Sequence, residues 1–250
     1  ANPIDKILTK LGLKNASSFL ALSEKVEKDL KFVNDGRKVY RSELPVYDCY
    51  NFDEQTNQVY SKQDFGFKAD DKLLLFFGYV RKYKGLDLLI DALAELVKDD
   101  PSYKLLAAGE FYDDEKFYSD KVASLKLSEH VKLLNQFIPN EEVIKYFEPS
   151  DLVVLPYRSA TQSGILNLAY GFYKPVLVTN VGGLAEFVDD GKTGFVIKPD
   201  SQKDLVEGII NFFRQRQNVN FAENIKNRVT KNSFNNLPKL FGEIISDSLK

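Results

Sequence analysis

The chain has 250 residues, with 34 lysines and arginines against 36 aspartates and glutamates, and a formal net charge of -2. Hydrophobic residues make up 44% and charged residues 28% of the sequence, which is typical of folded globular domains and argues against intrinsic disorder. The near-zero charge argues against a nucleic-acid partner, and no apolar run reaches the roughly 18–20 residues that cross a bilayer.

The first 45 residues predict a small piece with too little apolar surface for a core of its own. Its expected elements are a helix at 3–11, a strand at 18–22, a helix at 23–33 capped by Ser23, and a strand at 37–41. Residues 46–70 are polar and rich in Asn, Asp, Gln and Tyr, which indicates a linker or a long loop. We therefore divide the chain into this piece (1–45), the linker (46–70) and a domain (71–250).

From residue 72 onward, short apolar runs alternate with amphipathic segments. Strands are expected at 72–78, 103–108, 131–134, 151–155, 175–179 and 195–197. Helices are expected at 85–97, 113–125, 140–147 with Asn140 as the cap, 162–172, 184–188, and from the Asp200-Ser201 cap to 213, with helical segments beyond. This alternation predicts an α/β fold, a Rossmann-like parallel sheet with helices on both faces, whose ligand lies at the carboxyl ends of the strands.

The loop after the first of these strands, residues 78–85, combines glycines with three cations, among them Arg81 and Lys84. It lies between a strand end and a helix N-terminus, where free N–H groups and the helix dipole favour an anion. Arg81 or Lys84 could donate charge-assisted hydrogen bonds to a phosphate. A solvated basic loop would have the same composition, so both interpretations stay open.

A second loop, residues 157–164, follows the fourth strand and is rich in small hydroxyl residues. Its successive backbone N–H groups could surround a diphosphate at the start of the next helix. The alternative is ordinary helix capping by Ser159 or Thr161. Because both loops follow the carboxyl ends of strands, they can face the same crevice.

Two glycine motifs add weaker candidates. Gly182 and Gly183 permit a close backbone approach, and Glu186 could accept hydrogen bonds from a ligand hydroxyl or simply favour the first turn of its own helix. Gly109 and Glu110 end a strand beneath the expected crevice, where a plain strand terminator is the better interpretation.

Metal and thiol chemistry have little support in the sequence. Cys49 is the only cysteine and His130 the only histidine, which excludes an internal disulfide and a multi-histidine metal centre. We expect Cys49 to be an inert thiol in the linker and assign His130 no role. No metal site is predicted, and no Walker-type phosphate loop is present.

Six motifs follow one another in a set order: GYVRKYKGLD at 78–87, AGE at 108–110, SDLVVLPY at 150–157, KPV at 174–176, VGGLAE at 181–186 and GKTGF at 191–195. Together they resemble the C-terminal, donor-binding half of a GT-B fold glycosyltransferase, specifically of the retaining family 4 (glycosyl transferases group 1). The resemblance covers about residues 70–215. Residues 17–47 also resemble the last strand-helix-strand of that family's N-terminal domain and the interdomain linker.

The resemblance implies roles for individual residues. Lys84 should contact the donor diphosphate. The family's usual arginine directly follows the first glycine, where this chain has Tyr79, so Arg81 is the candidate substitute. Arg81 and Lys84 are thus the implied catalytic residues, because they would stabilise the leaving diphosphate. The implied donor-binding residues are Gly78, Gly109, Glu110, Phe137, Ile138, Thr161, Gln162, Ser163, Gly164, Asn167, Gly182, Gly183 and Glu186.

The resemblance also places the nucleotide base near Phe137 and Ile138.

The chain departs from the family at two positions. The family carries two glutamates eight positions apart, where this chain has Ala160 and Leu168. In the family, the first supports the sugar and the second binds the ribose hydroxyls, and this chain has neither carboxylate. Asn167 is the nearest polar replacement.

The function implied is retaining, metal-independent transfer from a UDP- or GDP-linked sugar to a glycan or lipid-linked acceptor, in cell-surface polysaccharide synthesis. No cofactor is expected, because the nucleotide sugar is a substrate. Most of the acceptor-side domain is missing, so a missing N-terminal domain or partner chain would supply it, and the chain alone should transfer little sugar. With no secretory signal, we expect a cytoplasmic location, peripheral to the inner membrane face.

Two other interpretations stay open. The chain could be a non-catalytic subunit that binds the nucleotide sugar and needs a partner for the acceptor half. It could also be a doubly wound domain of another class, either a GT-B epimerase or a flavodoxin-like signalling module. The epimerase needs catalytic acids that we cannot assign, and the signalling module needs acidic residues where this chain has cations.

Overall fold

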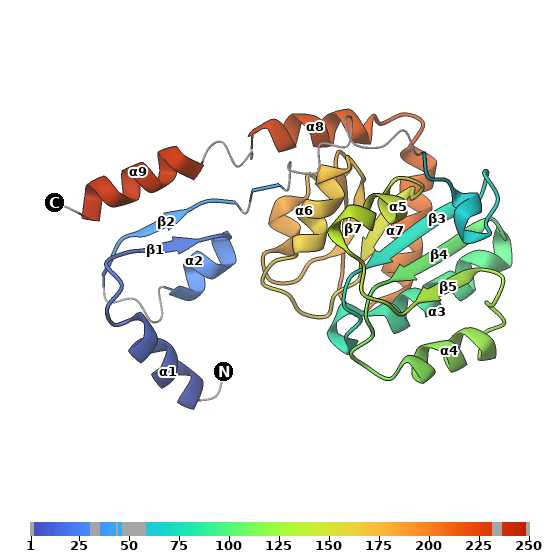
Figure 1. Cartoon of the computed structure of the whole chain (residues 1–250), viewed down its shortest axis with the longest axis horizontal. Coiled ribbons are helices and arrows are strands. Elements are labelled where there is room, and N and C mark those ends of the chain that lie inside the picture. Colours follow the sequence, from blue (N-terminus) through green and yellow to red (C-terminus); the bar gives the residue numbers. More distant parts are fainter. Residues whose placement is uncertain (1–2, 31–35, 44, 47–58, 232–236, 249–250) are drawn as a thin grey trace.

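The computed structural model describes residues 3–30, 36–43, 45–46, 59–231 and 237–248. Figure 1 shows two unequal parts: a large α/β domain, and a small N-terminal piece that lies beside it together with the last helix. Cys49 lies outside the described residues.

The large domain is built on a six-stranded, entirely parallel sheet with the strand order β5-β4-β3-β6-β7-β8. Its strands are β3 (Lys72–Phe77), β4 (Tyr103–Ala108), β5 (Val131–Leu134), β6 (Leu152–Leu155), β7 (Val176–Thr179) and β8 (Gly194–Ile197). The register places Leu74 opposite Leu105 on one side and opposite Leu152 on the other. Because β6 and β7 are buried along their whole length, both faces of the sheet need cover.

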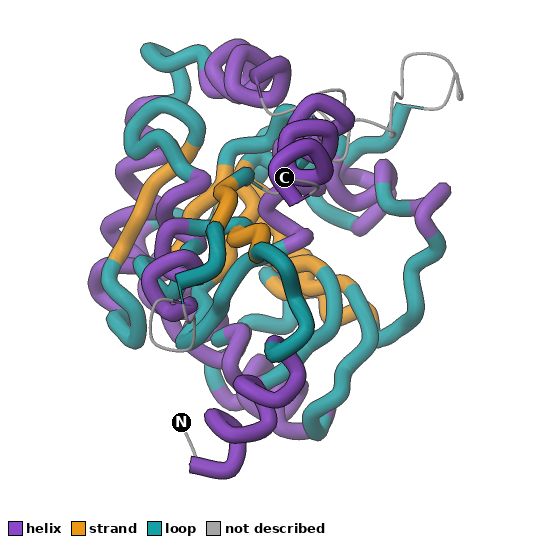
Figure 2. The backbone as a smooth tube through the Cα atoms, turned by 90° about the vertical axis from the view of Figure 1, so that its left-hand side faces the viewer, coloured by secondary structure: helices purple, strands orange, loops and turns teal. Residues whose placement is uncertain are grey.

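Helices cover both faces of this sheet, as the alternating pattern predicted. One face carries α3 (Leu86–Asp99), α4 (Glu115–Ser124) and α7 (Gln202–Gln215), and the other carries α5 (Ile144–Phe147), α6 (Gly164–Gly171) and α8 (Phe221–Lys231) (Figures 1 and 2). Alternate residues of β3 divide between the two cores, with Leu74 and Phe76 on the α3 side and Leu73 and Leu75 on the α6 side. The predicted α/β fold is therefore confirmed.

Short 3₁₀ helices connect these elements: η2 (Lys62–Phe65), η3 (Lys82–Lys84), η4 (Asn140–Glu142) and η5 (Leu184–Phe187). The single helix expected at 140–147 is divided into η4 and α5, and its cap is Pro139 rather than Asn140, because the extended backbone ends at the proline. The helix expected at 162–172 begins at Gly164, because the Ser163 hydroxyl accepts the N–H of Leu166 at 3.4 Å.

The N-terminal piece contains α1 (Pro3–Leu13), β1 (Phe19–Ala21), α2 (Glu24–Leu30) and β2 (Val39–Arg41). Its two strands pair in parallel, and the Ser23 hydroxyl accepts the N–H of Val26 at 3.2 Å, which confirms the predicted cap. The last helix, α9 (Leu237–Ser248), contacts this piece through Asp247, which accepts a hydrogen bond from Tyr40 at 2.8 Å. No helix in the described ranges is long and apolar enough to cross a bilayer.

Part of the segment expected to be a linker is folded onto the large domain. Residues 47–58 lie outside the described residues, but Val46, Phe65 and Phe67 are buried in the core on the α6 side of the sheet. The ring of Phe65 lies 5.6 Å from that of Tyr146, centroid to centroid. The predicted start of the large domain at residue 71 stays a prediction, although side chains before residue 71 already pack into the core of that domain.

An aromatic cluster in the core on the α6 side of the sheet provides a direct test of the packing there. Phe147 is fully buried, with its ring 4.9 Å from that of Phe77 and stacked 4.8 Å from that of Phe172. Phe147→Ala should lower the free energy of unfolding by about 3–5 kcal/mol, because it opens a cavity. Phe137→Ala is the control, since this side chain is 66% exposed and its loss should be nearly neutral in stability. Denaturant titration measures both, and a neutral Phe147→Ala would contradict the packing.

Candidate functional site

Two adjoining pockets lie at the carboxyl edge of the sheet, where the loops after β3, β4, β5 and β6 come together. The larger, of 440 Å³, is lined by Tyr83, Lys84, Tyr157, Ala160, Thr161, Gln162, Ser163, Gly164 and Ile165. The smaller, of 250 Å³, is lined by Phe77, Gly78, Tyr79, Lys84, Gly109, Glu110, Gln136, Phe137, Ile138, Asn140 and Ile165. Lys84 and Ile165 line both pockets, so the two form one cleft. We call the larger the loop pocket and the smaller the strand-end pocket.

Lys84 is the cation at the junction of the two pockets. It ends η3 and is only 8% exposed. In the described part of the chain its ammonium has no hydrogen bond or ion pair, and it lies 5.7 Å from the centre of the Tyr157 ring. Burial, and then the charge of Arg81, lower the pKa of Lys84 to about 8. A desolvated cation without a counter-ion is a strong site for an anion.

The loop pocket offers hydrogen-bond donors around this cation. Ser163 caps α6, so the free N–H groups at the start of that helix point toward the loop. The side-chain amide nitrogen of Gln162 is buried with no partner among the described residues. A buried donor without an acceptor costs about 1–3 kcal/mol, so an oxygen-rich ligand would be favoured here.

The strand-end pocket combines an apolar wall with one carboxylate. Phe137 and Ile138 form part of the wall, where the base site was expected, and Glu110 lines the pocket together with Gly78 and Gly109. Gln136 and Asn140 also line this pocket, although the sequence marked neither as a site residue and predicted Asn140 only as a helix cap. They adjoin predicted residues, which is the only signal that could have found them.

Arg81 lines neither pocket. Its guanidinium lies over the ring of Tyr112 at 4.7 Å, and that ring packs edge-on against Tyr79 at 4.9 Å. Arg81 is exposed and contributes to the positive potential felt by Lys84. Its direct contact with a ligand stays a prediction.

The positions of the family's two glutamates differ sharply in their surroundings. Ala160 lines the loop pocket beside Lys84, whereas Leu168 is buried in the apolar core. Asn167 is 4% exposed and lines neither pocket. Its proposed role with ribose hydroxyls therefore stays a prediction, and Glu110 is the carboxylate side chain that lines the strand-end pocket.

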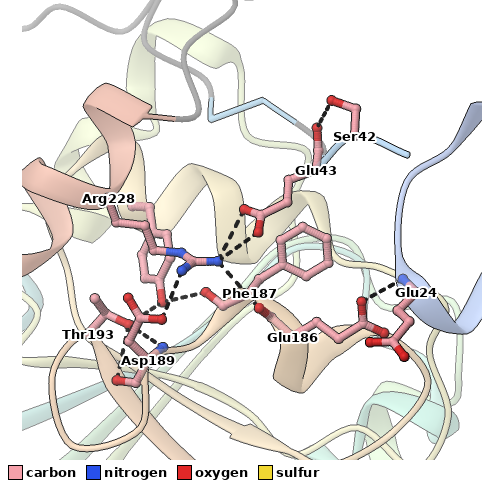
Figure 3. A network of polar contacts seen from close by, with 9 residues as sticks. Glu24, Ser42, Glu43, Glu186, Phe187, Asp189, Thr193 and Arg228 are labelled. Carbon is pink, nitrogen blue, oxygen red and sulfur yellow. Dashed lines mark hydrogen bonds and ion pairs between the residues drawn. The ribbon is translucent and has the colours of Figure 1, made fainter. Parts of the chain in front are cut away.

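Glu186 connects the two parts of the molecule (Figure 3). Its carboxylate accepts the backbone N–H of Glu24 at 2.6 Å and that of Lys25 at 3.1 Å, which caps the start of α2. Gly183, just before η5, donates its N–H to the carbonyl of Thr161 at 3.3 Å. Gly182 approaches so closely that a Cβ there would lie 1.6 Å from the Ala160 carbonyl oxygen. The glycine pair thus packs behind the loop pocket, and contact of Glu186 with a ligand stays a prediction.

Arg228 of α8 strengthens this connection, as Figure 3 also shows. Its guanidinium donates to Asp189 at 2.9 Å, to Glu43 at 3.1 Å and to the Glu186 carbonyl at 3.3 Å. No motif marked Arg228, because Glu43 lies 185 residues away in the sequence.

Metal ligands do not gather anywhere in the part of the chain that the structure describes, where no group of three or more His, Cys, Asp or Glu side chains is arranged to hold an ion. His130 contacts the Tyr103 carbonyl oxygen through Nδ1 at 3.0 Å and lines neither pocket.

Lys84→Met tests the desolvated ammonium through the pH dependence of stability. Since the pKa of Lys84 is lowered to about 8, its charged form destabilises the folded state at pH 7. The variant should therefore be more stable at pH 7, by about 3 kcal/mol. Between about pH 8 and pH 10.5 the folded wild type loses this proton before the unfolded chain does, so the difference should shrink. Lys82→Met, which removes an exposed charge from the same loop, is the control, and denaturant titration at pH 7 should find its stability close to that of the wild type.

Glu186→Ala tests the cap on α2. Removal of the carboxylate leaves the N–H groups of Glu24 and Lys25 without their acceptor, which should cost about 1 kcal/mol of local stability. Hydrogen exchange of residues 24–30 should accelerate severalfold. Glu207→Ala, an exposed residue of α7, is the control, and unchanged exchange in Glu186→Ala would contradict the capping role.

Comparison with known sequences gives a family and several relatives. A sequence model of the family described as Glycosyl transferases group 1 matches residues 59–232. The uncharacterized glycosyltransferase MJ1178 of Methanocaldococcus jannaschii is 30% identical over 159 residues, which are 64% of this chain and 41% of the relative. The putative teichuronic acid biosynthesis glycosyltransferase TuaC of Bacillus subtilis is 26% identical over 206 residues, 81% of this chain and 48% of the relative. The chain thus spans less than half the length of these relatives.

The fold is shared with GT-B glycosyltransferases of known structure. Anabaena Alr3699/HepE in complex with UDP and glucose superposes with a TM-score of 0.81 at 21% identity, over 97% of this chain and 66% of that one. The family match at 59–232 includes every residue that lines the two pockets. On this match, the chain belongs to the glycosyl transferases group 1 family.

Proposed function

We propose that this chain is the donor-binding, C-terminal part of a retaining family 4 glycosyltransferase, and that its cleft binds a nucleotide-diphosphate sugar with a UDP or GDP group. The observation that carries the proposal is the buried, unpaired ammonium of Lys84 at the junction of the two pockets. A ligand with one strongly anionic centre between two uncharged groups matches that arrangement.

The two pockets divide the donor between them. The loop pocket takes the diphosphate and the sugar, because Lys84, the Gln162 amide and the α6 N-terminus all offer donors to phosphate oxygens there. The strand-end pocket takes the nucleoside, whose base packs against Phe137 and Ile138 and whose hydroxyls face Glu110. Anabaena HepE, which shares this fold, has been crystallised in complex with UDP and glucose, in keeping with this class of ligand.

The reaction needs stabilisation of negative charge on the departing diphosphate while the sugar becomes oxocarbenium-like. Lys84 supplies a charge that lies outside bulk water, where its interaction with the leaving group is strong. Arg81 adds long-range potential from the rim of the cleft. These groups make a metal-independent mechanism sufficient, and no cofactor takes part.

The acceptor half of the reaction needs further protein. Since this chain spans less than half of its relatives, we propose that a fuller N-terminal domain or a partner chain binds a glycan or lipid-linked acceptor, and that the chain alone transfers little sugar. TuaC, named for teichuronic acid biosynthesis, supports a cell-surface polysaccharide as the product. We place the reaction in the cytoplasm at the inner membrane face. A non-catalytic subunit that binds the nucleotide sugar and needs a partner for the acceptor half is the second candidate.

Calorimetric titration with UDP-, GDP- and ADP-sugars tests the donor site. At least one should bind, and Lys84→Ala should weaken that binding at least tenfold, because the only buried cation that lines the described cleft is lost. Lys82→Ala removes an exposed charge from the same loop and should change the affinity less than threefold. Absence of binding by every nucleotide sugar would overturn the proposal. Robust transferase activity of the isolated chain would overturn the dependence on further protein.

A further inference from the structure

Arg158 occupies a position from which it contacts both loops of the cleft without lining either pocket. It follows β6 and begins the segment that leads to the loop pocket. A cation at this point in the sequence could serve as a further ligand-binding group. The structure gives its guanidinium other partners.

All three nitrogens of the Arg158 guanidinium are engaged by protein atoms. Two of them form a bidentate pair with the Asp87 carboxylate, at 2.8 Å each, and one of these also donates to the Lys82 carbonyl at 2.7 Å. The third, Nε, pairs with Asp200 at 2.9 Å. With two carboxylates and a carbonyl already bound, this side chain has little charge left to offer a phosphate.

These contacts surround the segment that carries Lys84. The Arg158 side chain holds the carbonyl of Lys82 and the carboxylate of Asp87, and its backbone N–H donates to the Tyr83 carbonyl at 2.7 Å. Lys84 lies between these anchored residues, so its backbone is fixed on both sides.

The approach of the two loops is tight as well as hydrogen-bonded. Gly85 adopts a φ of +74°, and a Cβ there would lie 2.2 Å from the Pro156 carbonyl oxygen. The loop after β3 therefore rests directly on the end of β6, two residues before Arg158. Arg158 thus joins the two loops close to this tight contact.

The Arg158–Asp87 pair is partly shielded from water, with side-chain exposures of 28% and 21%. Burial alone would raise the pKa of Asp87, but the hydrogen bonds and charge of Arg158 lower it below its ordinary value. The pair is therefore ionised at neutral pH, and bidentate geometry holds the guanidinium in one orientation. A lysine at position 158 would keep the charge but lose that geometry.

We propose that Arg158 is a positioning residue for donor binding: it fixes Lys84 in the cleft by clamping the loop after β3 to the loop after β6, and it does not bind the ligand itself. The proposal rests on the proposed function for its effect on the donor. Its structural part, the fixing of Lys84, holds for any anion in this cleft.

A double-mutant cycle with UDP and GDP as calorimetric probes tests the effect on binding. Arg158→Ala should weaken binding of whichever nucleotide the wild type takes about tenfold, and less than twofold when Lys84 is already Ala, because the clamp acts through Lys84. Arg158→Lys should behave like Arg158→Ala at smaller amplitude. Equal losses in both backgrounds, or full binding by Arg158→Lys together with loss in Arg158→Ala, would show a direct ligand contact and overturn the proposal.

Arg216→Ala is the matched control. Arg216 also pairs with an aspartate, Asp151 at 3.1 Å. Asp151 directly precedes β6, so this pair lies at the amino ends of the strands, away from the cleft. Its removal should leave nucleotide affinity within twofold in both backgrounds. A loss equal to that of Arg158→Ala would mean that any lost ion pair perturbs the cleft, and would overturn the specific role of Arg158.

A ligand-free measurement separates this inference from the proposed function. The difference in stability between Lys84→Met and the wild type should shrink from about pH 8 to pH 10.5. In an Arg158→Lys background, the released Lys84 gains water and this step should move to higher pH. If the pH range of this step is the same in the Arg158→Lys background, the positioning role is overturned, even if nucleotides bind. If the step moves to higher pH, the positioning role is supported, even if neither UDP nor GDP binds. If Arg158→Ala fails to fold, Arg158→Lys alone supplies both measurements.

Discussion

Burying a lysine ammonium without a counter-ion costs free energy, and the cleft of this protein is arranged around one such group. Lys84 loses water because Gly78 and Ile165 lie against it and Tyr157 closes one side. The neighbouring helix start adds positive potential instead of relieving the charge. The buried charge is therefore uncompensated until an anion enters. In the function we propose, the same arrangement would both bind the diphosphate and stabilise its negative charge as it departs.

The sheet makes this cost tolerable by holding the loops in place. β3 and β6 are adjacent and buried, so the segments that follow them leave the sheet side by side and need few additional contacts to fix their separation. Arg158 and the close approach at Gly85 supply those contacts. A charge held in this way keeps its orientation when a ligand binds, so the proposed reaction would need little reorganisation of the site.

The sequence predicted what local physics determines. The strands at 72–78 and 103–108 follow from apolar runs that end at glycine, and Lys84 was found because glycine and cations occur together between a strand and a helix. The cap at Asn140 was wrong because the tendency of one side chain to cap was weighed without the proline before it. Gln162 was predicted to hold the diphosphate through the backbone of its loop. The partners of Arg158 and Arg228 and the orphan side-chain amide of Gln162 were not predicted, because they depend on groups that the fold brings together from distant parts of the chain.

The short helix η5 shows that the cleft and the N-terminal piece are not mechanically independent. Gly183, which precedes η5, donates a hydrogen bond to the carbonyl of Thr161 in the loop pocket. Glu186, within η5, accepts hydrogen bonds from two backbone N–H groups of α2. Arg228 ties the same helix to Glu43, just past β2. A shift of the N-terminal piece would therefore move the backbone that lines the loop pocket. Because interactions in contact with one another couple energetically, the seating of the N-terminal piece and the affinity of the cleft should be coupled.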